Sequence, residues 1–580
     1  MLPSTASSQR KKYSLTAIFW LIAILLGSLQ AWVYRYNLSS DDLISYLDIG
    51  DAYLRGEWQA AINGYWSPLY SWILALTIFA LNPSTYWEFP TVKLANFLIY
   101  LFSLVCFNYF LRQLIFYYQV KIPECSRYRY YRIPVWVWLI LGYTLFLLSS
   151  LQWIGIYCDT PDMCVAAIVY LAAALLLRIY RCSRTWLNFS VLGAVLGFGY
   201  LAKTAMFPLA FVFLMTGMFS VGNLRKALLP TLASLLIFIT ISSPLIVAIS
   251  TAKGTLTFGD TGKLNYAWIV ANEVKPYRFW QGKETGSGKP KHAPREIFNN
   301  PEIFEFATPV SGTYPPWYDP SYWYEGLIVK FNFERQISVF EKNVSYYCNI
   351  FFGVLVFAYL IIAIAGGSFW LSVKGLIGNW VLLIPALAGL VIYMIGIDMP
   401  KAFIEKQPST RYIAPFIVLL LAGVFSSVRL PNVKGTKRLT ASIILAILVL
   451  INIQQVFYQT SEELWIILTE PKQHLQWQVA NTLNELGIQP GEKVAILGRY
   501  IYPHYHWARL AGVKIVAEVL DGYGFWTKDS VVRAKILKDI ERTGSSVIVQ
   551  KPGINIPHSV STDGWQKIGN TNYYAYFFQK

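Results

Sequence analysis

Long apolar runs recur along the chain from residue 15 to residue 458, and this feature constrains the fold more than any other. Hydrophobic residues make up 55% of the 580 residues and charged residues only 14%, whereas a soluble chain carries about 25% charged residues. Residues 459–580 instead have the pattern of a soluble domain. The sequence therefore predicts a polytopic α-helical membrane protein with a small soluble domain, and it excludes a cytosolic enzyme, a fibrous protein and a disordered chain.

Eleven apolar segments are predicted to span the membrane as helices. They are Leu15–Tyr34, Val92–Phe116, Pro134–Leu151, Met163–Leu177, Trp186–Leu201, Ala205–Val221, Ala227–Ile249, Ile350–Ile364, Leu376–Ile397, Tyr412–Val428 and Leu439–Phe457. A further apolar segment, Ser67–Leu81, has about 15 residues and is short for a span, so it is predicted to be an interfacial helix.

The basic residues give the predicted orientation. The chain has 49 Lys and Arg against 32 Asp and Glu, a net charge of +17. If Ser67–Leu81 does not cross, the basic clusters after the first span, including those at Arg112, Arg178 and Arg225, lie on the cytoplasmic side. This predicts a multi-pass protein of a bacterial inner or plasma membrane, with a cytoplasmic N-terminus and an extracytoplasmic C-terminal domain. The charge excess is thereby assigned to topology and not to a nucleic-acid partner.

This topology places two long segments outside the membrane, residues 35–91 and 250–348. The second contains the aromatic stretch GTYPPWYDPSYWYEG at 312–326 and is too long to be a simple connector, so we expect it to serve function. We predict two domains, 1–458 in the membrane and an α/β domain at 459–580. In the latter, strands are predicted at 493–497, 513–519 and 545–550, and helices at His504–Leu510 and Ser530–Arg542. Neither GxGxxG nor GxxxxGK[ST] occurs there, so the pattern does not indicate a nucleotide.

An acidic pair, Asp41 and Asp42, directly follows the first predicted span. Ser40 is a suitable N-cap, which would place both acids in the first turn of a helix. At 100° per residue Asp41, Ser45 and Asp48 share one face, opposite an apolar face, which predicts an amphipathic helix at the membrane surface. Two interpretations stay open: the acids act in catalysis, or they only cap and solvate this helix.

Further candidate residues lie at the predicted outer ends of later spans. Asp159 and Asp162 could hold a divalent cation or position an acceptor, although Pro161 and Asp162 also form a common helix opening. Lys203 lies between two apolar spans, where a cation costs about 2.5–3.5 kcal/mol and is often functional. Arg411 and Tyr412 open a late span, and a cation there suits a phosphate-bearing ligand. His504 and His506 are expected at the surface of the α/β domain.

The stretch from Asp41 to Trp58, DDLISYLDIGDAYLRGEW, followed by GYWSPLY at 64–70, resembles the first extracytoplasmic loop of class C glycosyltransferases (GT-C fold). The resemblance is to the branch of aminoarabinose lipid A transferase and the protein O-mannosyltransferases. It covers residues 1–250 well and 350–460 loosely, and it includes an acid after the third span, a Gly-x-x-x-Lys turn and a late Arg-Tyr. These positions are Asp159 or Asp162, Lys203, and Arg411-Tyr412 in this chain.

The resemblance implies an inverting hexosyl- or pentosyltransferase that moves a sugar from a polyprenyl-phosphate-linked donor to a lipid, protein or polysaccharide acceptor at the extracytoplasmic face. Asp41 or Asp42 would be the general base, and Lys203, Arg411 and Tyr412 would bind the donor phosphate. Asp159 and Asp162 would contact the acceptor or a metal; no cofactor is certain, and a divalent ion stays open. The alternatives are a transporter or flippase of lipid-linked glycans and a surface polysaccharide polymerase or ligase. A transporter predicts charged residues at the membrane midplane and an internal repeat, neither of which the sequence contains.

Overall fold

The fold is taken from a computed structural model of the full chain. It describes residues 4–121, 130–131, 133–181, 185–272, 274, 279–306, 308–309, 311–351, 369–400, 408–427, 430–431, 436–469, 473–498, 505–554 and 562–578. These residues form two compact units. The first consists of Met1–Tyr34, Lys93–Phe258 and Asn332–Pro471, and the second consists of Arg35–Val92, Gly259–Phe331 and Lys472–Lys580.

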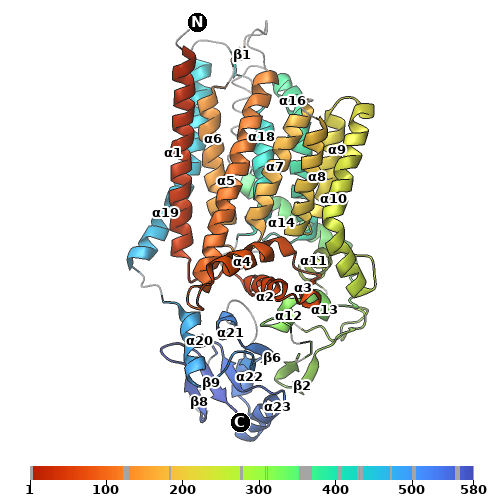
Figure 1. The fold of residues 1–580 in the computed structure, drawn as a ribbon, viewed down its shortest axis with the longest axis vertical. Helices are drawn as coiled ribbons and strands as arrows, with labels where there is room; N and C mark the ends of the chain where they lie inside the picture. The colour runs from red at the N-terminus through yellow and green to blue at the C-terminus, as the bar shows by residue number, and fades with distance from the viewer. Residues whose placement is uncertain are drawn as a thin grey trace. The chain divides into compact units, whose positions relative to one another are not determined.

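The first unit is a helical bundle whose long helices run side by side (Figure 1). Its helices are α1 (Ser4–Val33), α5 (Glu88–Lys121), α6 (Val135–Leu147), α7 (Asp162–Tyr180), α8 (Thr185–Ala202), α9 (Met206–Ser220), α10 (Leu224–Lys253), α14 (Phe333–Phe351), α16 (Phe369–Gly378), α17 (Trp380–Gly396), α18 (Ala414–Phe425) and α19 (Thr436–Thr469). The π-helical turn η1 (Leu148–Ile154) continues α6, and the 3₁₀ turn η4 (Ser409–Tyr412) precedes α18. The short strands β1 (Tyr130–Tyr131) and β4 (Leu430–Pro431) pair antiparallel.

Small residues allow the helices of the bundle to approach closely. A Cβ atom on Gly193 of α8 would overlap the carbonyl oxygen of Ser234 on α10, so only glycine fits at this contact. Close backbone approach at small residues is a common way for helices to associate in a membrane, where the lipid supplies no hydrophobic driving force.

Six helical segments in the described part of the chain are long and apolar enough to cross a membrane, which agrees with an integral membrane protein. They are Tyr13–Val33, Glu88–Lys121, Val135–Ile154, Asp162–Tyr180, Thr185–Ala202 and Leu224–Lys253. Four other apolar helices are shorter, among them α4 (Pro68–Leu81), which confirms the prediction of a short helix at Ser67–Leu81. Most of the predicted span Ile350–Ile364 lies outside the described residues.

Most of the predicted span Leu376–Ile397 forms one apolar helix, α17, whereas its first residues, up to Gly378, belong to α16. The chain breaks at Asn379, between α16 and α17. The side chain of Asn379 donates to the carbonyl oxygen of Gly423 at 2.7 Å and accepts from Lys121 at 2.6 Å. These contacts give a buried polar residue partners outside the helix, which compensates for the interrupted backbone hydrogen bonding.

The second unit contains a seven-stranded sheet of order β2-β3-β6-β5-β7-β9-β8. Its strands are β2 (Arg295–Asn299), β3 (Glu302–Glu305), β5 (Lys493–Leu497), β6 (Lys514–Val519), β7 (Val547–Gln550), β8 (Trp565–Lys567) and β9 (Tyr574–Phe577). The three predicted strands are confirmed as β5, β6 and β7. The hairpin β2–β3, from the predicted long loop 250–348, adds antiparallel to β6 with Ile303 opposite Val519. The long loop and the C-terminal residues therefore share one sheet.

Short helices accompany this sheet. They are α2 (Asp42–Leu54), α3 (Trp58–Ala61), α4, α11 (Thr261–Asn265), α12 (Pro315–Tyr318), α13 (Pro320–Trp323), α20 (Leu475–Glu485), α21 (His506–Leu510), α22 (Gly522–Trp526) and α23 (Ser530–Glu541), with the π-helical turn η2 (Tyr266–Val270). The core contains Ile303, Leu497 and Val519 from the strands and Trp526 and Ile540 from the helices. The predicted domain boundary at position 458 falls inside α19, which continues to Thr469. Further along the chain, the last segment of the second unit begins at Lys472.

Candidate functional site

Helix α2 carries the acidic pair and is buried on both faces. On its apolar face, Leu43 and Leu47 are fully buried, and a Cβ on Gly50 would lie 3.0 Å from the carbonyl oxygen of Ser71 on α4. The polar residues Asp41, Ser45 and Asp48 are buried as well. Of the two interpretations left open, the one in which these acids only solvate the helix does not fit this burial, because other residues of the second unit cover the face.

The start of α2 also differs from the prediction by one residue. Asp42 is the first helical residue and Asp41 is the N-cap, whereas Ser40 was the predicted N-cap. The Oγ of Ser40 still accepts the N–H of Asp42 at 3.0 Å, so the serine satisfies one of the free donors of the first turn. Asp41 thus lies just before the helix, and its carboxylate is not used as a side-chain cap.

Two residues from distant parts of the sequence contact the acidic pair. The Nε2 atom of His506, on α21, lies 3.1 Å from Oδ1 of Asp41, and both side chains are at most 2% exposed. The indole N–H of Trp317, on α12, donates to Oδ1 of Asp42 at 3.1 Å. The prediction that His506 lies at the surface was wrong, because α21 packs this side chain into the second unit. His504 lies outside the described residues.

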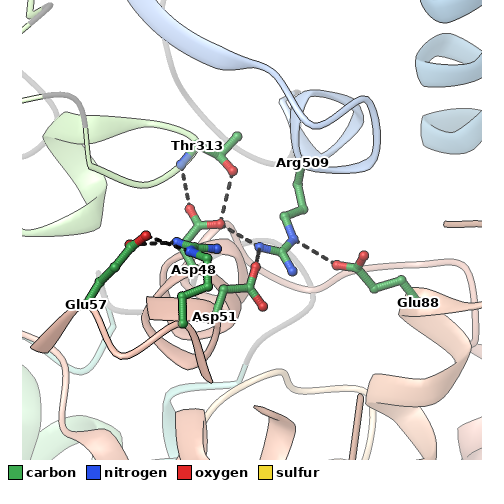
Figure 2. Close-up of polar contacts among 7 residues, drawn as sticks. Asp48, Asp51, Glu57, Glu88, Thr313 and Arg509 are labelled. Carbon is green, nitrogen blue, oxygen red and sulfur yellow. Dashed lines mark hydrogen bonds and ion pairs between the residues drawn. The ribbon is translucent and has the colours of Figure 1, made fainter. Parts of the chain in front are cut away.

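A buried arginine joins three carboxylates one helical turn after His506 (Figure 2). Arg509 Nη1 lies 2.8 Å from Oδ1 of Asp48 and also pairs with Asp51, while its Nε lies 2.9 Å from Oε1 of Glu88. Asp48 accepts two further bonds, from the N–H of Thr313 at 2.6 Å and its hydroxyl at 3.1 Å. The cluster ties α21 to α2, the start of α5 and the long loop.

The three carboxylates of this cluster keep Arg509 ionised. Burial alone would lower the pKa of Arg509, but the carboxylates of Glu88, Asp51 and Asp48 outweigh burial and hold the pKa well above its ordinary value. Three acids around one cation are a costly arrangement in a buried place, and they are tolerated only while the cation is present.

A second buried histidine of this unit, His474, is expected to make the stability of the protein depend on pH. Burial lowers the pKa of His474 to about 4; its ring stacks on Tyr36, and its Nδ1 accepts the N–H of Trp477 to cap α20. Below pH 6.5 the unfolded chain takes up a proton here that the folded chain does not, so stability falls as the pH falls from about 6.5 to about 4.

We expect the melting temperature of the protein, followed by tryptophan fluorescence, to fall across this pH window. The variant His474→Asn keeps a side-chain acceptor at the cap and removes the titration, so its melting temperature is expected to fall less over the same window. An equal fall in the variant would contradict the assignment to His474.

In the first unit, Asp162 brings together three of the sequence candidates. Lys203, between α8 and α9, pairs with Oδ1 of Asp162, and Arg411 Nε lies 3.1 Å from Oδ2. Thr160 donates to the same Oδ2 at 2.8 Å. Arg411 donates to the hydroxyl of Tyr412 at 2.6 Å, and the Lys203 ammonium lies 4.3 Å from the centroid of the Tyr412 ring. We call Asp162, Lys203, Arg411 and Tyr412 the cation cluster.

Asp159 lies in a separate pair. Its Oδ1 is 2.6 Å from the ammonium of Lys93 on α5, and both side chains are at most 1% exposed. Asn96, one turn further along α5, donates to the same oxygen at 3.1 Å. This pair is balanced in charge and fully buried, which is the ordinary arrangement of a structural ion pair in an apolar surrounding.

The metal site at Asp159 and Asp162 stays a prediction, and the contacts of the two carboxylates do not favour it. The carboxylates of Asp159 and Asp162 already pair with Lys93, Lys203 and Arg411, and positive partners repel a cation. Among the described residues, no group of three or more His, Cys, Asp or Glu side chains is arranged to hold a metal ion. We therefore build no step on a metal.

Sequence reasoning missed His506, Arg509, Trp317 and Lys93. Two signals were present: His506 and Arg509 are three residues apart in a predicted helix and so share a face, and Lys93 is a cation within a predicted span. Of the predicted site residues, the structure brings Asp162, Lys203, Arg411 and Tyr412 together in the first unit. Asp41 and Asp42 belong to the second unit.

No protein-family model and no curated protein matches the sequence. Among solved structures, the fold is similar to ArnT from Cupriavidus metallidurans bound to undecaprenyl phosphate, with a TM-score of 0.49, 11% identity, and 96% of this chain and 97% of that chain covered. It is also similar to the oligosaccharyltransferase of Archaeoglobus fulgidus, with a TM-score of 0.45, 12% identity, and 93% and 69% covered. Both are glycosyltransferases of the GT-C fold, the class that the sequence resembles.

Proposed function

We propose that the chain is an integral membrane glycosyltransferase. It moves a sugar from a polyprenyl-phosphate-linked donor to an acceptor at the extracytoplasmic face, with inversion at the anomeric carbon. The observation that carries this proposal is the charge of the cation cluster: one carboxylate, Asp162, faces two cations, Lys203 and Arg411. The sequence resemblance to class C glycosyltransferases supplies the reaction class.

The cation cluster suits the phosphate of the donor. Its three charged side chains leave one unit of positive charge, and such a charge in a poorly solvated place is stabilised by an anionic ligand. Lys203 is 20% exposed whereas Asp162 is 3% exposed, so the ammonium is the part of the cluster that a ligand reaches first. Arg411 is held in place by Asp162 and Tyr412, which preorganises its guanidinium.

Asp41 is our proposed general base. It accepts the proton of the acceptor hydroxyl while that oxygen forms a bond to the anomeric carbon. The bond between this carbon and the phosphate oxygen breaks, its electron pair stays on the phosphate, and Lys203 and Arg411 stabilise the polyprenyl phosphate that leaves. Burial supports Asp41 over Asp42 for this role, because Asp41 is more shielded from water that would compete with the acceptor hydroxyl.

The proposal is tested by transfer of label. The purified protein in nanodiscs is incubated with undecaprenyl-phosphate-linked pentose or hexose, labelled in the sugar, and with the envelope fraction of the native cells. We expect the label to move to acceptor material and free undecaprenyl phosphate to appear in equal amount. Movement of the intact donor across the membrane, without cleavage of the sugar–phosphate bond, would contradict the proposal and favour a transporter.

Removing either cation of the cluster is expected to weaken donor binding. Hydrogen bonds to charged groups contribute about 1.5–3 kcal/mol, so Lys203→Met and Arg411→Met should each weaken the affinity for undecaprenyl phosphate by about 10- to 100-fold. Binding is measured by titration of the purified variants with undecaprenyl phosphate.

The balanced pair in the same unit gives a matched control. The double variant Lys93→Met, Asp159→Asn removes one buried cation together with its acid, and we expect undecaprenyl phosphate to bind within about threefold of the unmodified protein. If Lys203→Met and Arg411→Met bind as tightly as this control, the cation cluster is not the phosphate site.

A further inference from the structure

The acidic residue proposed as the base has a histidine partner from the C-terminal part of the chain. The distance between His506 Nε2 and Asp41 Oδ1 is 3.1 Å, and the two residues are 465 positions apart in sequence. The two atoms lie at ion-pair distance but outside the angle of a hydrogen bond, so donation from an N–H at Nε2 to Oδ1 requires a small rotation of the ring. Burial of both side chains removes competing water and makes this contact worth more than at the surface.

The surroundings of His506 keep its ring in place. Its helix, α21, is attached to α2 through Arg509, which contacts Asp48 and Asp51 on α2. The ring of Phe89 lies edge-on to the imidazole, with 6.1 Å between ring centroids. The imidazole is therefore held near Asp41 by the attachment of α21 to α2 and by its packing against Phe89.

We propose that His506 is a positioning residue for the transfer reaction, which fixes the orientation of the Asp41 carboxylate toward the acceptor hydroxyl. This inference rests on the proposed function of Asp41. It gives the C-terminal part of the chain a role in the reaction, because α21 carries the residue that orients Asp41. A displacement of about 1 Å at a reacting group can cost about 10²-fold in rate, so orientation is a measurable contribution.

The test compares two substitutions of the histidine. His506→Phe keeps a ring and removes the donor, and we expect kcat of transfer to fall by about 10²-fold while KM for the lipid-linked donor changes by less than about threefold. His506→Gln keeps an N–H near the position of Nε2, and we expect kcat to recover to within about tenfold of the unmodified protein. Melting temperatures of both variants are measured, and the comparison uses samples that remain folded at the assay temperature.

A second histidine–carboxylate pair provides the control. His292 Nε2 lies 3.0 Å from Oε2 of Glu325, and its ring stacks on Tyr322. His292→Phe removes the same kind of contact in the same unit, and we expect transfer to stay within about twofold.

The outcomes separate the two proposals. If Asp41→Asn abolishes transfer while folded His506→Phe transfers normally, His506 has no positioning role and the proposed function stands. If His506→Gln is as impaired as His506→Phe, an N–H at this position does not restore transfer, and the inference also fails. On an Asp41→Asn background, His506→Phe should add less than about twofold, because the carboxylate that it positions is already absent. If Asp41→Asn itself transfers normally, Asp41 is not the general base, and the inference about His506 falls with that assignment.

Discussion

The Asp41→Asn variant is expected to transfer sugar about 10²- to 10⁴-fold more slowly than the unmodified protein, the range that a general base contributes. Asparagine has nearly the shape of aspartate and can still face His506, so folding should be preserved while the proton acceptor is lost. The measurement is the initial rate of label transfer from undecaprenyl-phosphate-linked sugar, at a donor concentration above KM.

Asp42→Asn separates the two members of the acidic pair. Asp42 accepts a bond from Trp317, and asparagine can accept the same bond through its carbonyl oxygen, so we expect a loss of less than about tenfold. If Asp41→Asn, Asp42→Asn and the double variant, all folded, transfer at the unmodified rate, neither aspartate is the base and the mechanism is wrong.

Arg509→Met is expected to destabilise the second unit by about 3–5 kcal/mol, because it leaves Asp48, Asp51 and Glu88 without their shared cation. Methionine fills much of the volume of the aliphatic part of arginine, so the loss of charge dominates over loss of packing. The free energy of unfolding is measured by denaturant titration followed by tryptophan fluorescence, with the protein in detergent.

An arginine on the surface of the same unit provides a matched control. Arg55 pairs with Glu57 at 2.8 Å, and both side chains are at least half exposed. Arg55→Met is expected to change the free energy of unfolding by less than about 0.5 kcal/mol. Equal effects of Arg509→Met and Arg55→Met would show that the buried cluster does not stabilise the unit.

The sequence predicted best what depends on local pattern. The strands at 493–497 and 514–519 are short apolar runs with β-branched residues, and the helix at Ser530–Glu541 follows the N-cap Asp529, which accepts the N–H of Val532. These signals act within a few residues, so they survive into the folded chain.

The joining of distant segments into one sheet could not be predicted in this way. The strands β2 and β3 are only five and four residues long and include charged residues such as Arg295 and Glu305, so their pattern resembles that of a loop. Their place is fixed by pairing with β6, more than 200 positions away. Pairing between strands this far apart in sequence produces no periodic pattern within either strand that a local prediction could detect.

The candidate site shows the same division. Asp162, Lys203 and Arg411 were each identified because charge is scarce in an apolar chain, and the structure adds that they contact one another. The partner of Asp41 was assigned to the surface, because a histidine next to Tyr505 and Trp507 carries no local sign of a distant carboxylate. The scarcity of charge in the sequence indicates which residues are candidates for the site, and only the fold shows which of them contact one another.

The most direct test of the account is a structure of the protein with undecaprenyl phosphate bound, determined in nanodiscs. We expect the phosphate oxygens to lie within hydrogen-bond distance of Lys203 Nζ and of the Arg411 guanidinium, about 2.7–2.9 Å for charged pairs. A phosphate bound at other side chains, with Lys203 and Arg411 still paired with Asp162, would contradict the central claim that the cation cluster binds the donor phosphate.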